Sequence, residues 1–104
     1  MTSDSQIFDI YSLLLNLPES DYFRNILTTS NMEVGVIKLK KNQQDTQQPH
    51  DFDEIYYIIS GNGSLDIDGT KNDICPGKVI YIPRKIPHSF QSHSNELIVL
   101  YILA

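Results

Sequence analysis

The chain has 104 residues, enough for one domain with a single modest core and too few for two. Eight Lys and Arg residues stand against 13 Asp and Glu residues, giving a formal charge of −5, and the basic residues form no dense stripe that would bind phosphate backbones. We therefore expect no nucleic-acid partner. The single cysteine, Cys75, cannot form an internal disulfide, and the sequence has neither a leader pattern nor an apolar run long enough to span a membrane. These features predict a cytoplasmic protein without a membrane partner.

The N-terminal part of the chain divides into a tail and an arm. Residues 1–6 are small and polar, and we expect a flexible tail there. Residues 7–29 are expected to hold an N-terminal arm and a first strand. The start of this segment is short, rich in residues that favour strands and ended by Pro18, so a helix and an extended arm are both compatible with it. In a helix, one face would hold Ile7, Ile10, Tyr11 and Leu14.

Short runs rich in Ile, Val, Tyr and Phe dominate the rest of the chain and are separated by Gly, Pro, Asn and Ser. Runs 22–29 and 32–41 flank a Ser-Asn turn and predict a hairpin. After a polar loop, further strands are expected over 54–60, 64–68, 71–75, 78–83, 88–92 and 96–103. Short strands at near-regular intervals are typical of an antiparallel barrel or a two-sheet sandwich, so the predicted fold class is all-β.

The run 54–60 differs on its two faces, because alternate residues of a strand share a face. Glu54, Tyr56 and Ile58 lie on one face, and the opposite face is wholly apolar. Run 97–103 is apolar on both faces, although antiparallel sheets usually leave one face to water. The N-terminal arm or a second copy of the chain would have to cover these outer faces, and we predict a homodimer.

Two histidines stand in matching places. His50 and His88 each follow a proline directly, and each begins or precedes a predicted strand. Glu54 follows His50 by four residues. If the two strands are neighbours, two imidazoles and one carboxylate converge inside the mouth of the barrel. This ligand set suits divalent iron, manganese, nickel or zinc, and it leaves coordination positions open for water or a substrate.

The segments around these residues resemble the two motifs of the cupin superfamily, in its small single-domain, conserved-barrel (cupin type-2) form. The segment "QPHDFDEIYYIISG" matches the first motif from His50 through Glu54 to Gly61, with Gln48 in place of a first histidine. The segment "PRKIPHSFQS" keeps the proline and the histidine of the second motif. It departs from that motif at two positions, which hold Lys85 in place of a glycine and Ser92 in place of an asparagine.

The resemblance covers about residues 30 to 103 and implies a fold and a ligand set. The implied fold is a single jelly-roll-like antiparallel β-barrel over residues 30–104, with a metal inside it. The implied ligands are His50, Glu54 and His88. Gln48 would be a fourth contact through its amide oxygen, which is a weaker ligand than an imidazole nitrogen. With one imidazole fewer, the barrel could also function without metal.

Simpler interpretations exist for the same residues. The three ligand candidates could be ordinary polar residues at the ends of a barrel, although their spacing and strand faces favour a metal site. Tyr56 shares the face of Glu54 and could donate a proton, or it could be a core aromatic residue with a satisfied hydroxyl. Arg84 and Lys85 precede His88 in a turn, where they could attract an anionic substrate or simply be solvated.

Two classes of function fit this sequence. In the first, the protein is a metal-dependent enzyme of the dioxygenase, isomerase or lyase type that acts on a small organic molecule, with Glu54 and Tyr56 as candidate catalytic residues. In the second, it is a non-catalytic barrel that binds or senses a small ligand, with or without metal. The chain offers no independent general base and no helix-turn-helix pattern, so the sequence leaves open whether the protein is an enzyme.

Overall fold

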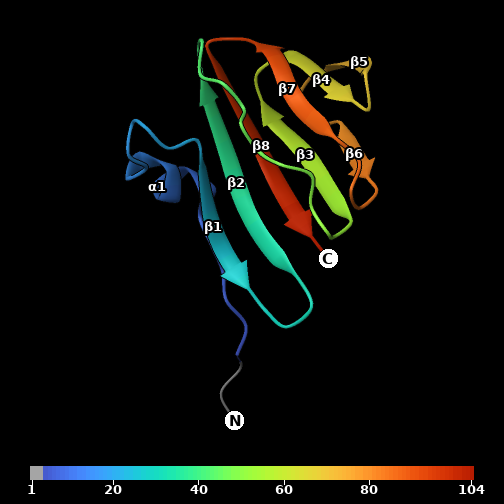
Figure 1. The fold of residues 1–104 in the computed structure, drawn as a ribbon. Coiled ribbons are helices and arrows are strands. Elements are labelled where there is room, and N and C mark those ends of the chain that lie inside the picture. Colours follow the sequence, from blue (N-terminus) through green and yellow to red (C-terminus); the bar gives the residue numbers. More distant parts are fainter. Residues whose placement is uncertain (1–3) are drawn as a thin grey trace.

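A computed structural model describes residues 4–104, except for the side chain of Ser92; residues 1–3 of the expected tail lie outside this range. Within it the chain forms one short helix and eight strands (Figure 1). The elements are α1 (Ile10–Leu15), β1 (Phe23–Thr28), β2 (Glu33–Lys40), β3 (Glu54–Ser60), β4 (Gly63–Ile67), β5 (Thr70–Ile74), β6 (Val79–Ile82), β7 (His88–His93) and β8 (Glu96–Leu103). The predicted all-β fold class is confirmed, and the strands differ from the predicted runs by only one or two residues at their ends.

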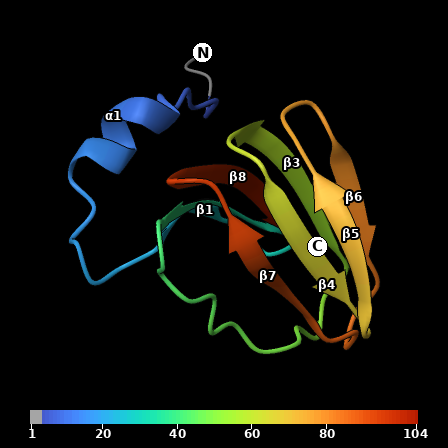
Figure 2. The ribbon, with the colours of Figure 1, turned by 90° about the horizontal axis from the view of Figure 1, so that it is seen from above.

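The strands form two antiparallel sheets. The larger sheet has the order β1-β2-β8-β3-β6, and the smaller one has the order β5-β4-β7. The predicted hairpin is confirmed as the β1–β2 pair, with Phe23 opposite Ile37 and Thr28 opposite Glu33. Seen from above, the small sheet lies across the large one, so that the two sheets enclose the core (Figure 2). That core is a continuous cluster of aliphatic and aromatic side chains from both sheets, with Tyr56, Ile58, Leu65, Phe90, Leu97 and Val99 among its members.

Strand β3 has the two faces that its sequence predicts. Glu54, Tyr56 and Ile58 are buried on the inner face, whereas Tyr57 on the outer face is 42% exposed. β8 lies between β2 and β3 and alternates in the same way, with Leu97 and Val99 in the core. The inner face of β3 and β8 therefore carries one carboxylate, Glu54, among mostly apolar groups.

The ambiguous N-terminal segment forms a helix, α1, which begins after Asp9. The Asp9 carboxylate accepts a hydrogen bond of 3.2 Å from the backbone N–H of Ser12, which is the usual way to cap a helix N-terminus. Leu14 packs against Val36 and Ile98 on the outer face of the large sheet. The arm thus covers part of the outer face, as Figure 1 shows beside β1 and β2.

Only part of the predicted helical face is buried. Leu14 is buried and Ile10 packs beside it, but Ile7 and Tyr11 are exposed. Ile7 precedes the helix, which begins at Ile10, and the six helical residues bring only Leu14 and Ile10 against the sheet. No helix in residues 4–104 is long and apolar enough to cross a membrane.

The outer face near β6 is apolar and lies open. Tyr81 of β6 pairs with Ile55 of β3, and Ile55 pairs with Ile102 of β8, so apolar residues form a row across three strands. A second row runs through Val79, Tyr57 and Leu100. Val79 and Tyr81 are 64% and 56% exposed. The arm covers a different part of the sheet and leaves this surface uncovered by any described segment.

Candidate metal centre

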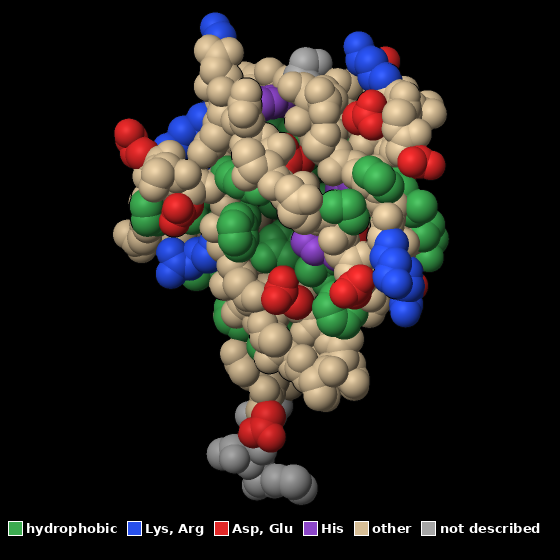
Figure 3. All heavy atoms as spheres, viewed as in Figure 1, with side chains coloured by type: hydrophobic (Ala, Val, Ile, Leu, Met, Phe, Trp, Pro, Cys, Tyr) green, Lys and Arg blue, Asp and Glu red, His purple; other side chains and the backbone are tan. Residues whose placement is uncertain are grey.

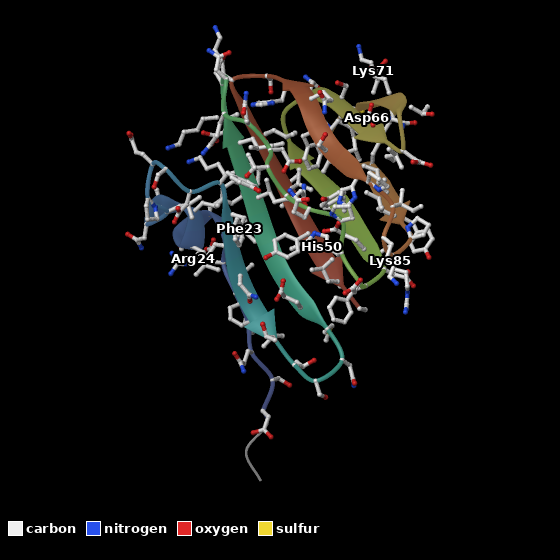
Figure 4. All side chains as sticks on the ribbon, viewed as in Figure 1. Phe23, Arg24, His50, Asp66, Lys71 and Lys85 are labelled. Atoms are coloured by element: carbon white, nitrogen blue, oxygen red, sulfur yellow. The ribbon has the colours of Figure 1, made fainter. Side chains whose placement is uncertain are left out.

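Three separate segments bring the predicted ligands together at one end of the barrel. Glu54 is the first residue of β3 in the large sheet, and His88 is the first residue of β7 in the small sheet. His50 lies in the loop between β2 and β3. In Figure 1 this end is the lower one, where the β1–β2 turn, the start of β3 and the C-terminus meet. In Figure 4, His50 lies over the inner face of the large sheet.

The three side chains form a compact and mostly buried group. One donor atom from each of His50, Glu54 and His88 lies within 4.8 Å of the others. Glu54 is 2% exposed, His88 is 8% exposed and His50 is half-buried. Bonds of about 2.0 to 2.2 Å to a divalent metal would bring such donors to within roughly 3 to 4.4 Å of one another. In a tetrahedral or facial arrangement the donors would lie roughly 3 to 3.6 Å apart, so the widest separation would have to shrink by about 1 Å on metal binding.

The contact between His88 and Glu54 supports a cation at this position. Nδ1 of His88 lies 2.8 Å from the carbonyl oxygen of Ile86, which can only accept, so Nδ1 carries a proton. The other nitrogen, Nε2, lies 2.9 Å from Oε1 of Glu54. Both atoms are buried and neither has a hydrogen-bond partner of good geometry. If the imidazole is neutral, a lone pair of Nε2 faces a lone pair of Oε1. A proton or a metal ion between the two atoms would remove this repulsion.

The same surroundings act on the protonation of His88. Burial lowers the pKa of His88, whereas the Glu54 carboxylate and the Ile86 carbonyl raise it, and the net result is a pKa above the usual value of 6.5. The site therefore attracts positive charge. A metal ion would compete with this proton, because a histidine binds metal through a neutral nitrogen.

The amide that reaches the centre belongs to Gln47. Its Oε1 accepts a hydrogen bond of 3.0 Å from the hydroxyl of Tyr56 and lies 3.4 Å from Nε2 of His50. Its Nε2 donates to the Asp45 carboxylate at 2.7 Å, which fixes the orientation of the amide. Asp45 in turn accepts from the backbone N–H of Phe90 and holds the loop against β7. Gln48, the residue that the motif comparison selected, has an exposed side chain.

Tyr56 is a buried core residue with a satisfied hydroxyl. It packs against Phe90 with ring centroids 5.1 Å apart. Burial raises the pKa of Tyr56 well above its usual value of 10.0, and the nearby Glu54 and Asp45 carboxylates raise it further. The phenol thus stays protonated and acts as a hydrogen-bond donor beside the centre.

A cavity of about 100 Å³ adjoins the centre, and apolar side chains make up much of its wall. The lining includes Tyr22, Phe23, Ile37, Tyr101 and Leu103, together with His50, Glu54, Gln47 and Glu33. The cavity shares Glu33, His50 and Leu103 with a wider groove of about 400 Å³ at the mouth, between the β1–β2 turn and residues 49–52. A ligand could therefore enter through the groove and reach His50 and Glu54.

Glu33 and Tyr101 are site residues that the sequence did not identify. Glu33 shares a strand face with Ile37, but only the pairing of β2 with β8 places it opposite Leu103 and hence two strands from Glu54. Tyr101 lies so close over Gly35 that a Cβ atom at that position would overlap the tyrosine ring. The available signal in the sequence was Gly35, because a glycine inside a strand often marks the close approach of another group.

Arg84 and Lys85, and the third histidine of the chain, His93, lie outside the centre. Arg84 forms an ion pair of 3.6 Å with Asp53, and Lys85 is exposed in the turn before β7. Nε2 of His93 lies 2.7 Å from the carbonyl of Lys40. None of these three side chains lines the cavity or its groove.

Comparison with known proteins agrees with this architecture. Residues 35–104 match the family described as the cupin domain. An uncharacterized protein of Streptomyces coelicolor is 30% identical over 82 residues, which cover 79% of this chain and 78% of that protein. The fold is similar to that of a cupin protein from Bacteroides fragilis, with a TM-score of 0.74, 21% identity, and 99% and 86% of the two chains covered. A conserved protein from Streptococcus pyogenes has a TM-score of 0.75 and 18% identity, with 99% and 90% covered. The chain belongs to the cupin family.

Proposed function

We propose that the protein binds one divalent transition metal ion, iron, manganese, nickel or zinc, through His50, Glu54 and His88. The contact of 2.9 Å between Nε2 of His88 and Oε1 of Glu54 carries this proposal, because both atoms are buried without another partner. The hydrogen bond from Nδ1 to the Ile86 carbonyl supports it further, since a second partner of this kind usually orients a metal-binding histidine. Ligand type alone does not select among these metals.

A side-chain amide would complete the ligand set. Gln48 is the candidate that the motif comparison gives, and Gln47 is the one whose oxygen lies near His50. The Gln47 oxygen has two lone pairs, so it could bind the metal through one and keep the hydrogen bond from Tyr56 through the other. If it does not bind the metal, the amide still orients Tyr56 beside the centre.

We propose that the metal-loaded protein acts on a small organic molecule, as an enzyme of the dioxygenase, isomerase or lyase type. A bound metal ion would supply a Lewis acid with open coordination positions. The chain itself would orient the molecule between His50 and the aromatic wall and exclude water through Ile37 and Leu103. The hydroxyl of Tyr56 would become a donor to the molecule by exchanging its partner Gln47.

A non-catalytic barrel that binds or senses a small ligand is the second candidate. One observation favours it: the hydroxyl of Tyr56 is already engaged with Gln47, so the buried donor nearest the centre is not free. Turnover of a small molecule by the metal-loaded protein would favour the enzyme, and saturable binding without turnover would favour the binding protein.

The metal content of the purified protein tests the proposed metal site. Untagged protein is purified and analysed for metals, together with the variants His50→Ala, Glu54→Ala and His88→Ala. We expect close to one metal ion per chain in the parent and little in the variants. His93→Ala is the matched control, because His93 contacts Lys40 and not the centre. Full occupancy in all three ligand variants would contradict the assignment.

We also propose that the chain forms a homodimer in the cytoplasm. The open apolar rows on β6, β3 and β8 support the dimer, because a monomer rarely leaves such a surface to water. The free, exposed thiol of Cys75 is compatible with a reducing compartment. Sedimentation at micromolar concentration should give a dimer, and Tyr81→Lys should weaken it. A clean monomer in the parent would contradict the dimer.

A further inference from the structure

The walls of the cavity carry negative charge without a compensating positive side chain. Glu33 and Glu54 both line the cavity of about 100 Å³, and Asp51 joins Glu33 in the groove outside it. Among the described residues, no Lys or Arg lines either space. On the face seen in Figure 3, the Lys and Arg side chains lie around the margin, while hydrophobic, histidine and acidic side chains gather near the middle.

The nearby basic residues are directed elsewhere. Arg84 pairs with Asp53, Lys38 pairs with Glu96 at 3.6 Å, and Arg24 reaches the carbonyl of Leu13 in the arm. In Figure 4, Arg24 and Lys71 lie at the edges of the molecule, away from His50. Lys85 is hydrogen-bonded to His50 through the backbone, but its side chain is exposed and lines neither the cavity nor the groove. An anion in the cavity would therefore find no cationic side chain to pair with.

Glu33 and Glu54 stand at the same level of the barrel. Glu33 is opposite Leu103, and Leu103 is opposite Glu54, so the two carboxylates are separated by one strand on the inner face. Two strand spacings place their backbones roughly 10 Å apart. Glu54 belongs to the ligand group, whereas Glu33 forms no ion pair with any described residue. Its charge is thus free to act on whatever occupies the cavity.

A second observation shows that this acidic pair faces a ligand position. Oε1 of Glu54 and Nε2 of His88 are buried, unpaired and part of the ligand group. A metal ion held by His50, Glu54 and His88 would adjoin the cavity that Glu33 also lines. A divalent ion and the Glu54 carboxylate together carry a net charge of +1, which would attract anions, and the charge of Glu33 opposes this attraction.

We propose that Glu33 makes the cavity selective for small uncharged ligands with a nitrogen or oxygen donor and penalises carboxylates and other anions. This inference rests on the proposed metal site, because the metal provides the attachment point for the donor. The size of the cavity fits a ligand of a handful of non-hydrogen atoms, with any larger part extending into the groove. Glu33 acts in this proposal as a residue that determines specificity.

The test uses two probes of similar size and different charge. The protein is loaded with Co²⁺, and its visible absorption is titrated at pH 8 with acetate, an anion, and with imidazole, which is neutral at this pH. The measured quantity is the ratio of the acetate Kd to the imidazole Kd. Comparing this ratio between the parent and Glu33→Gln cancels the intrinsic preference of the metal for either donor.

We expect the ratio to fall about fivefold to tenfold in Glu33→Gln, since a unit charge roughly 9 Å away acts with about this strength at an effective dielectric constant near 30. Glu33→Asp keeps the charge and should keep most of the discrimination. Glu19→Gln removes the same charge from an exposed site outside the cavity and should leave the ratio unchanged. A ratio within twofold of the parent in a Glu33→Gln protein that holds Co²⁺ would overturn the inference.

Co²⁺ uptake and salt dependence distinguish failure of the metal proposal from failure of the selectivity proposal. A parent protein that takes up no Co²⁺ would overturn the metal proposal and this inference together, whereas uptake with an unchanged ratio would overturn only the inference. If Glu33→Gln fails to fold, the parent is titrated in about 20 mM and about 500 mM sodium perchlorate, a weakly coordinating salt. Screening should reduce the acetate penalty, and a ratio insensitive to salt would overturn the selectivity.

Discussion

The backbone N–H of Lys85 donates a hydrogen bond of 2.6 Å to the carbonyl oxygen of His50. The turn before His88 therefore holds the loop that carries His50, and the two motifs support each other through the main chain. Lys85 adopts a φ of 67°, a left-handed conformation that glycine accepts at little cost. The glycine that the family pattern has at this position is explained by that conformation.

Replacing Lys85 with Gly should stabilise the protein by roughly 0.5 to 1 kcal/mol, because relief of the left-handed conformation exceeds the entropic cost of a glycine. Denaturant unfolding of the metal-free protein measures the change. Lys71→Gly is the control, since Lys71 is an exposed residue of β5 and its replacement should destabilise. Equal destabilisation by both changes would contradict the argument.

Glu54→Gln should separate metal binding from stability. The side-chain amide introduced by this change could donate a hydrogen bond to Nε2 of His88 and remove the unpaired contact between two buried acceptors. We expect metal content to fall strongly while the metal-free variant unfolds within about 1 kcal/mol of the metal-free parent at pH 8. Elemental analysis measures the metal content, and denaturant unfolding in the presence of a chelator measures the stability of the metal-free protein. A collapse of the fold in this variant would show that the carboxylate has a structural role.

Gln47 and Gln48 should differ in their importance. Gln47→Ala removes the acceptor of the buried Tyr56 hydroxyl and should cost about 1 to 3 kcal/mol of stability in the metal-free protein. It should also weaken metal binding, measured by competition with a chelator. Gln48→Ala alters an exposed side chain and should change stability by less than about 0.5 kcal/mol. A larger loss of metal affinity in Gln48→Ala than in Gln47→Ala would restore Gln48 as the fourth contact.

Gly35→Ala should displace the ring of Tyr101, because a Cβ at this position overlaps it. We expect a loss of about 1 to 3 kcal/mol. In a Tyr101→Leu background the shorter side chain leaves more room, so the same alanine should cost much less. Thermal unfolding of the parent, the two single variants and the double variant gives the coupling free energy between positions 35 and 101. Purely additive effects would mean that Gly35 does not serve to accommodate the ring.

Tyr101 should make stability depend on alkaline pH. Burial raises the pKa of Tyr101 to about 12 from its usual value of 10.0, and Glu33 and Glu54 contribute to the rise. The folded state thus prefers the protonated phenol, so this contribution is full below pH 10 and is lost as the pH rises toward about 12. Unfolding free energy should fall less steeply over this range in Tyr101→Phe. The absorbance of ionised tyrosine should lose a step near pH 12 in the same variant, and identical titrations would contradict the assignment.

Much of the architecture follows from local patterns in the sequence. Alternation along residues 54–60 determines that Glu54 and Tyr56 share the buried face, because the side chains of a strand point to opposite sides in turn. Clusters of Gly, Pro and Asn mark the strand ends, since few other residues suit tight turns. The resemblance to the cupin motifs then selected His50, Glu54 and His88 as one group. Their strands are not neighbours in one sheet, and the three residues meet because the two sheets face each other.

The tertiary structure decided what depends on register and on loop conformation. Glu33 faces the cavity beside Glu54 only because β2 and β3 both pair with β8, and strand register cannot be derived from the alternation of one strand. Gln47 points to Tyr56 because Asp45 ties the loop to Phe90. The arm is a helix because its short apolar side finds Val36 and Ile98 on the sheet. The sequence by itself determined the strands and the three ligand candidates, whereas the charge of the cavity wall and the identity of the inward amide came from contacts between residues distant in the chain.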